Sequence, residues 1–173
     1  MKKSISIWQL VGFGVTSVLG TLLHFLYDWT GGNVFAALIS GVNESTWEHM
    51  KLLFFPMFIF AIIQSRFFKE YENFWCVKLI GILVGLIMIP VLFYTYNGVI
   101  GKSPDWINIS IFFISAAVAY FIEARLFKKG IGCKYPTLAF SLICIIGILF
   151  FIFTFATPGI DLFKDPVTGN YGI

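Results

Sequence analysis

The chain is poor in charge. Only 12% of its 173 residues are Asp, Glu, Lys or Arg, whereas soluble domains carry about 25%. In water this composition would expose large apolar surfaces, which excludes an ordinary soluble domain. Because 58% of the residues are hydrophobic, the lipid bilayer is the expected solvent and partner. With a net charge of only +3, nucleic acid is not an expected partner.

Cysteine and the familiar catalytic signatures are also scarce. The three cysteines, Cys76, Cys133 and Cys144, have neither CxxC nor metal-ligand spacing, and we expect free thiols. The chain contains no HExxH zinc motif and no GxSxG nucleophile motif. The usual signatures of membrane hydrolases are therefore absent, and the sequence leaves open whether the protein is an enzyme.

Five long apolar stretches are present. An α-helix of about 20 residues crosses the roughly 30 Å hydrocarbon core, and strands with open edges cannot lie in lipid. The predicted spans are residues 5–28, 46–67, 74–96, 106–127 and 137–157. The expected fold of residues 1–173 is therefore a single all-α domain, a polytopic transmembrane helix bundle.

Lys and Arg are unequally distributed between the two ends of these spans. With the N-terminus in the cytoplasm, the inner side holds Lys2, Lys3, Arg66, Lys69, Lys78, Arg125, Lys128, Lys129 and Lys134. The outer side then holds only Lys51, Lys102 and Lys164. Positive charge favours the cytoplasmic side, so we predict a multi-pass protein of the cytoplasmic membrane, N-terminus in and C-terminus out. The loop 29–45, with a short helix at 34–40, and the tail 158–173 are then outside.

Polar residues concentrate where this outer loop meets the second span, in VNESTWEHMK (42–51). Ser45-Thr46-Trp47-Glu48 has the S-x-x-E form of a capping box, which predicts a helix start. Acidic residues near a helix N-terminus also suit its dipole, so capping accounts for Glu44 and Glu48. Capping does not account for His49.

The first span carries a matching polar face. Small and polar residues share one side at 100° per residue: Ser17, Gly20, Thr21, His24 and Asp28. Such a side is presented to neighbouring helices rather than to lipid. His24 lies one turn below Asp28 and needs a polar partner, either Asp28 itself or Glu44 or Glu48. Polar groups buried in a membrane suggest function.

Two interpretations of this cluster are open. His24 and Asp28 have the i,i+4 spacing that can hold one Zn²⁺ or Mn²⁺ ion. The candidate ligands are His24, Asp28, Glu44 and Glu48, with His49 as an alternative. Adjacent Glu48 and His49 point about 100° apart and are not expected to bind one ion together. The interpretation we favour from sequence alone is a metal-free network, in which Asp28 orients His24 and Lys51 neutralises a glutamate.

Three further features concern packing. Gly81-x-x-x-Gly85 permits a close helix approach in the third span. Glu123, near the inner end of the fourth span, is expected to pair with Arg125 or to extend to the interface. The tail 158–173 mixes turn formers with apolar residues, so we expect it to fold back on the outer surface.

Four segments carry a resemblance that covers nearly the whole chain. They are GTLLHFLYDWTGGN (20–33), VNESTWEHMKLLFFP (42–56), IPVLFYTYNGVIGK (89–102) and FKDPVTGNYGI (163–173). The chain resembles a family of small bacterial and archaeal membrane proteins that is known only as a domain of unknown function. The resemblance implies a multi-pass fold and no particular substrate. The residues that match its recurrent motif are His24, Asn43, Glu44, Trp47, Glu48, His49 and Lys51. Asp28 stands where many relatives have Glu, and either is an acid.

The function expected from these residues is binding of a small ligand or ion at an outward-facing polar site. The site residues are His24, Asp28, Asn43, Glu44, Glu48, His49 and Lys51. One alternative is a metal-dependent hydrolase, in which Glu44 or Glu48 is the base for a metal-bound water. Another is a transporter, which the apolar middles of the spans disfavour. The last is an accessory protein that binds a membrane partner or a second copy of the chain.

Overall fold

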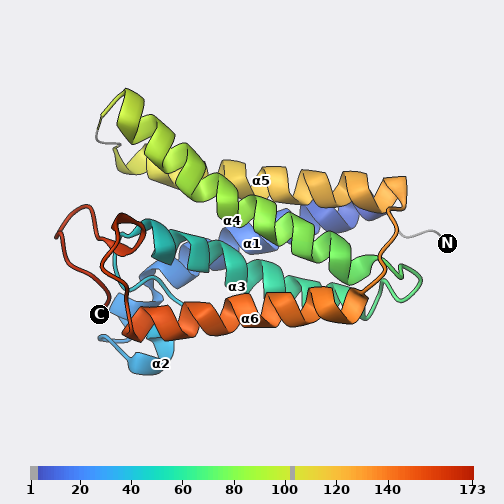
Figure 1. Cartoon of the computed structure of the whole chain (residues 1–173), viewed down its shortest axis with the longest axis horizontal. Coiled ribbons are helices and arrows are strands. Elements are labelled where there is room, and N and C mark those ends of the chain that lie inside the picture. The colour runs from blue at the N-terminus through green and yellow to red at the C-terminus, as the bar shows by residue number, and fades with distance from the viewer. Residues whose placement is uncertain (1–3, 102–103) are drawn as a thin grey trace.

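The structure is a computed structural model that describes residues 4–101 and 104–173, and its helices form a bundle (Figure 1). Lys2, Lys3 and Lys102, which enter the charge asymmetry, lie outside the described residues. The helices are α1 (Ile5–Trp29), α2 (Val34–Ala37), α3 (Thr46–Ser65), α4 (Phe74–Val99), α5 (Asp105–Lys129) and α6 (Pro136–Phe155), followed by the 3-10 helix η1 (Asp161–Phe163).

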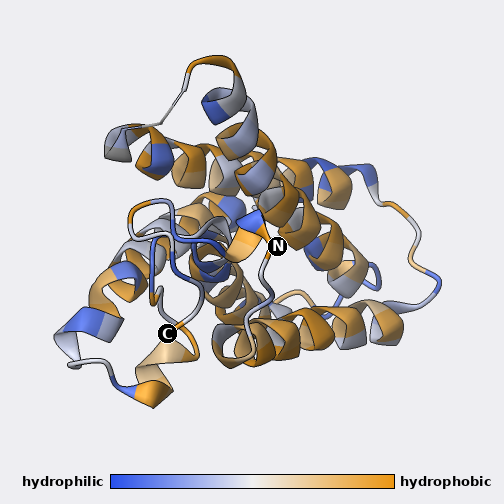
Figure 2. Cartoon of the chain, turned by 60° about the vertical axis from the view of Figure 1, so that its left-hand side comes forward, coloured by the Kyte–Doolittle hydropathy of each residue, from blue (hydrophilic) through white to orange (hydrophobic). Residues whose placement is uncertain are grey.

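Five of these helices, α1, α3, α4, α5 and α6, are long and apolar enough to cross a membrane. They correspond to the five predicted spans, so the prediction of an all-α bundle with five spans is confirmed. Figure 2 shows the hydrophobic colour along the helix sides and the hydrophilic colour mainly in loops and at helix ends. Exposed Ile, Leu, Val and Phe side chains cover the sides of the long helices, a surface that is favourable in lipid and costly in water.

Small residues let the helices approach closely. A Cβ atom added to Gly85 of α4 would lie 2.6 Å from Leu53 of α3 and 3.3 Å from Ala119 of α5. A Cβ on Gly20 of α1 would collide with the ring of Phe112 and lie 3.0 Å from the carbonyl oxygen of Leu52. The predicted role of Gly85 in close packing is therefore confirmed, and Gly20 does the same for α1.

The C-terminal tail folds back over the end of the bundle where α1 ends and α3 begins (Figure 1). The ring of Phe163 is buried, with its centroid 4.7 Å from that of Trp47 on α3. At the other end of the tail, Nδ2 of Asn43 donates to the carbonyl of Gly172 at 2.9 Å. The expectation that the tail packs on the bundle is therefore met.

Cys76 and Cys133 form a disulfide, so the prediction of free thiols is wrong for this pair. Only Cys144 is free. The cysteines are 57 residues apart in sequence, but the loop between α5 and α6 returns to the start of α4 and brings their Cα atoms within 6.0 Å. Asn73 holds the same loop by donating to the carbonyl of Ile131 at 2.9 Å.

Candidate functional site

The site begins at the N-terminus of α3, which Ser45 caps. The Ser45 hydroxyl accepts the Glu48 N–H at 3.4 Å, as the capping motif predicts. The reciprocal half of the capping box is not formed, because Oδ1 of Asn43 rather than Glu48 accepts the Ser45 N–H, at 2.9 Å. The Glu48 carboxylate is thereby left for another partner.

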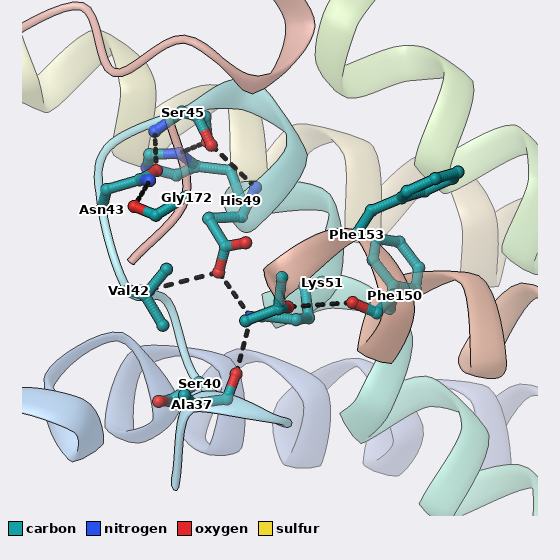
Figure 3. A network of polar contacts seen from close by, with 12 residues as sticks. Ala37, Ser40, Val42, Asn43, Ser45, His49, Lys51, Phe150, Phe153 and Gly172 are labelled. Atoms are coloured by element: carbon teal, nitrogen blue, oxygen red, sulfur yellow. Dashed lines mark hydrogen bonds and ion pairs between the residues drawn. The ribbon is translucent and has the colours of Figure 1, made fainter. Parts of the chain in front are cut away.

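That partner is Lys51, one turn further along α3. Figure 3 shows the contacts of the Lys51 ammonium group. It forms an ion pair with Oε2 of Glu48, donates to the Ala37 carbonyl at 2.8 Å and donates to the Thr154 hydroxyl at 3.0 Å. An ammonium group has three N–H donors, so all three are used. Oε2 of Glu48 also accepts the Val42 N–H at 3.1 Å.

This network is structural. Both Lys51 and Glu48 are buried, and their contacts connect α2, α3, α6 and the loop before α3. The predicted neutralisation of a glutamate by Lys51 is correct, and the glutamate is Glu48. Glu48 was also a predicted metal ligand, and it does not belong to the group of possible ligand atoms described next.

His24, Glu44 and His49 come together beside this network. Nε2 of His24 lies 3.6 Å from Oε1 of Glu44, and Nε2 of His49 lies 3.6 Å from Oε2 of Glu44. The two imidazole rings are 5.8 Å apart, centroid to centroid. One ligand atom from each residue can be chosen so that all three lie within 4.8 Å of one another.

The His49 ring is oriented by the helix start. Its Nδ1 lies 2.9 Å from the carbonyl oxygen of Ser45, and the dashed contact between these residues is visible in Figure 3. A carbonyl can only accept, so Nδ1 carries a proton, and in the neutral ring the lone pair is then on Nε2, which faces Glu44. Histidines that bind metals commonly have this arrangement, with the other ring nitrogen donating to a carbonyl or carboxylate.

The spacing of these atoms is compatible with an ion between them. Hydrogen bonds between N and O have lengths of about 2.9 Å, which is shorter than both 3.6 Å separations. Zn²⁺ bonds of about 2.1 Å in a tetrahedron put neighbouring ligand atoms roughly 3.4 Å apart. Two imidazoles and one carboxylate also form a donor set that zinc accepts.

Asp28 does not join this group. Its side chain is exposed, and no hydrogen bond or ion pair between Asp28 and His24 occurs in the part of the chain that the structure describes. The side chain lies near the end of α1, and Glu44 is the partner of His24 instead. Among the described residues, the group that the structure brings together is thus His24, Glu44 and His49, whereas the predicted ligands were His24, Asp28, Glu44 and Glu48.

A cavity of about 450 Å³ adjoins the three residues. It is lined from α1, α3, α4, α5 and the C-terminal tail, with His24, Glu44 and His49 in its wall. The tail contributes Pro166 and Val167. In the tail, both carboxylate oxygens of Asp165 accept hydrogen bonds within the turn, from the Val167 N–H at 2.7 Å and the Thr168 hydroxyl at 2.9 Å.

A second polar group, inside the bundle and absent from the sequence-based site, consists of Lys78 and Glu123. Their side chains are almost fully buried and form an ion pair between α4 and α5. Nearby, the Tyr120 ring lies 5.4 Å from the Lys78 ammonium, and the Tyr120 hydroxyl shares a 2.7 Å hydrogen bond with Thr16 of α1. The expected partner of Glu123, Arg125, was therefore wrong. From the sequence, Lys78 was counted only among the basic residues of the inner side and was not considered as a partner of Glu123.

Five apolar helices with a polar cluster at one end define a multi-pass membrane protein of the helix-bundle class. The chain belongs to a family of unknown function (DUF6512), which it matches over residues 1–173. No curated protein and no solved structure matches the chain.

Proposed function

We propose that the protein binds one divalent metal ion, Zn²⁺ or Mn²⁺, through His24, Glu44 and His49. The observation that carries this is the convergence of three ligand atoms within 4.8 Å, with the His49 ring oriented by Ser45. Three protein ligands leave a coordination position for water or for a ligand. The cavity beside the three residues provides the space for that ligand.

The same three residues without metal would form a histidine–carboxylate network, the interpretation that sequence alone favoured. Two observations support the metal instead. The Nε2–carboxylate separations of 3.6 Å are long for hydrogen bonds. Asp28, which was to orient His24 in the network, is exposed and without that contact in the described residues. The part of the network that does form, Glu48 with Lys51, includes none of the three proposed ligands.

Binding, rather than hydrolysis, is the function that the geometry supports. A hydrolase of the expected kind needs a carboxylate base that is not itself a ligand. Glu48 is paired with Lys51, and Asp165 accepts hydrogen bonds from its own turn, so each of these carboxylates already has partners other than a bound water. Glu44 is assigned as a ligand.

Metal analysis of the detergent-purified protein tests the proposal. After loading with Zn²⁺ or Mn²⁺ and desalting, we expect about one ion per chain, with affinity lowered more than about tenfold in His24→Ala, Glu44→Gln and His49→Ala. Asp28→Asn is the matched control, since it removes an exposed carboxylate one turn from His24 and should keep the ion. Wild-type protein that retains no ion, or equal loss in the Asp28→Asn control, would contradict the assignment.

We also propose that the site faces the outside of the cytoplasmic membrane. The Lys and Arg distribution supports this orientation. The Cys76–Cys133 disulfide argues the other way, since disulfides persist in oxidising compartments and this pair would then face the cytoplasm. The charge distribution outweighs the disulfide, because it is the combined effect of Lys and Arg residues along the whole chain.

Reporter fusions test this orientation. A periplasmic-active reporter such as alkaline phosphatase fused to Ile173 should be active, and a cytoplasmic-active reporter there should be silent. The reverse pattern would invert the topology.

A further inference from the structure

The cavity beside the three ligands changes character with depth. Each helix contributes a polar residue near the end of the bundle and a nonpolar one about one turn deeper, roughly 5–6 Å along the axis. The pairs are His24 and Gly20 on α1, His49 and Leu52 on α3, Asn97 and Phe93 on α4, and Asn108 and Phe112 on α5. The cavity therefore has a polar mouth and an apolar floor.

The cavity also reaches the sides of the bundle. Phe25 and Ile109 both line it, and both are exposed, at 44% and 57% of their surface. They belong to α1 and α5, whose exposed sides face lipid in a membrane-spanning bundle. At the level of its mouth the cavity therefore borders the bilayer, and a hydrocarbon chain that enters there can extend against the apolar floor.

Charge at the mouth is set by the ion. A divalent cation with two neutral imidazoles and one carboxylate has a net charge of +1. None of the described residues that line the cavity is Lys or Arg, and Glu44 alone would repel an anion. The ion then supplies both the attraction for an anionic headgroup and the open coordination position for one of its oxygens.

We propose that the ligand of this cavity is an amphiphile with an anionic oxygen headgroup, a phosphate or a carboxylate, on a hydrocarbon chain. The headgroup binds the ion at His24, Glu44 and His49, and the chain lies against the apolar floor. A volume of about 450 Å³ is within the range of small-molecule sites, roughly 300–1,000 Å³. The inference rests on the proposed metal site and adds the class of ligand.

Four probes separate the contributions of chain, charge and ion. Zn²⁺-loaded protein in a non-ionic detergent is titrated with decyl phosphate, decanoate, uncharged decanol and inorganic phosphate, and bound molecules are counted by native mass spectrometry. We expect about one decyl phosphate or decanoate per chain, binding at least about tenfold more tightly than decanol or inorganic phosphate. Removal of Zn²⁺ should abolish this preference. The stronger of the two anionic probes identifies the headgroup.

A filled cavity provides the matched test. Thr21 lines the cavity, and its hydroxyl bonds only within its own helix, to the Ser17 carbonyl at 2.8 Å. Thr21→Phe should weaken binding of the preferred probe more than about tenfold while Zn²⁺ is retained. The control is Val18→Phe on the same helix, where the side chain is 60% exposed and outside the cavity lining. It should change neither binding.

The outcomes distinguish the two proposals. If Zn²⁺ binds but decyl phosphate and decanoate bind no better than decanol and inorganic phosphate, the ligand class is wrong and the metal site stands. If Zn²⁺ does not bind, the metal site fails and the ligand class fails with it. Should Thr21→Phe lose Zn²⁺ through misfolding, the four probes on the wild-type protein still decide.

Discussion

Nε2 of His49 faces the carboxylate of Glu44 across 3.6 Å, because the other nitrogen of the ring is held by the carbonyl of Ser45. Ser45 also caps α3 through its hydroxyl. One residue thus fixes both the start of the helix and the direction of the imidazole. The polar cluster at this end is therefore a consequence of local helix-start chemistry combined with the arrival of α1, which brings His24 to the other side of Glu44.

His49→Asn separates these two roles of the ring. The asparagine amide can occupy the place of Nδ1 and donate to Ser45, but nothing occupies the place of Nε2. We expect Zn²⁺ affinity to fall more than about tenfold while the melting temperature of the metal-free protein stays nearly unchanged. Calorimetric titration with Zn²⁺ and thermal unfolding in the same detergent provide the two readouts. Unaltered affinity in His49→Asn would remove His49 from the ligand set.

The sequence predicted the number of spans and the end of the bundle at which the polar residues cluster, because both follow from local patterns. Hydrophobic length identifies membrane helices, and the S-x-x-E motif identifies the start of α3. The exact partners could not be obtained in this way, since they depend on helix rotation. Asp28 shares a helical face with His24, yet only His24 reaches Glu44.

Contacts between distant segments were missed for the same reason. Lys78 and Glu123 are 45 residues apart in the sequence. At neither position does the sequence alone show whether the side chain extends to the interface or points into the bundle. The disulfide between Cys76 and Cys133 depends on where the α5–α6 loop returns, which no spacing rule specifies. The sequence accordingly predicted that Glu123 pairs with its neighbour Arg125 or extends to the interface, and Lys78 was not considered.

Removal of the Lys51 ammonium should be costly. Lys51→Met leaves the buried Glu48 carboxylate without its cation and the Ala37 carbonyl without its donor. Breaking a buried ion pair on one side costs about 3–5 kcal/mol, so the free energy of unfolding should fall by about that amount. The double variant Glu48→Gln/Lys51→Met should recover part of the loss. Thermal or chemical unfolding in detergent measures both, with exposed Lys69→Met as a control that should change stability by less than about 0.5 kcal/mol.

The Lys78–Glu123 pair predicts strong coupling between α4 and α5. Lys78→Met and Glu123→Gln should each lower the free energy of unfolding by about 3–5 kcal/mol, because each leaves a buried polar partner behind. The double variant should cost clearly less than the sum of the two. Arg125→Met, at an exposed position, should change stability by no more than about 0.5 kcal/mol. Additive effects of Lys78→Met and Glu123→Gln, or a large effect of Arg125→Met, would contradict the observed pairing.

The attachment of the C-terminal tail depends on Gly172. Its φ is +69°, and an added Cβ would collide with the Thr157 hydroxyl, so alanine is both strained and without space. Its carbonyl accepts from Asn43, and displacement of Gly172 would break that bond. In Gly172→Ala we therefore expect the last residues of the tail to detach while the bundle remains folded. Hydrogen exchange in detergent should show faster exchange across 164–173 and unchanged exchange in α3.

Gly159→Ala is the control, because nothing lies within 4 Å of its added Cβ and its φ is not in the positive range. Equal exchange in Gly172→Ala and wild type would mean that the Asn43 contact does not hold the tail.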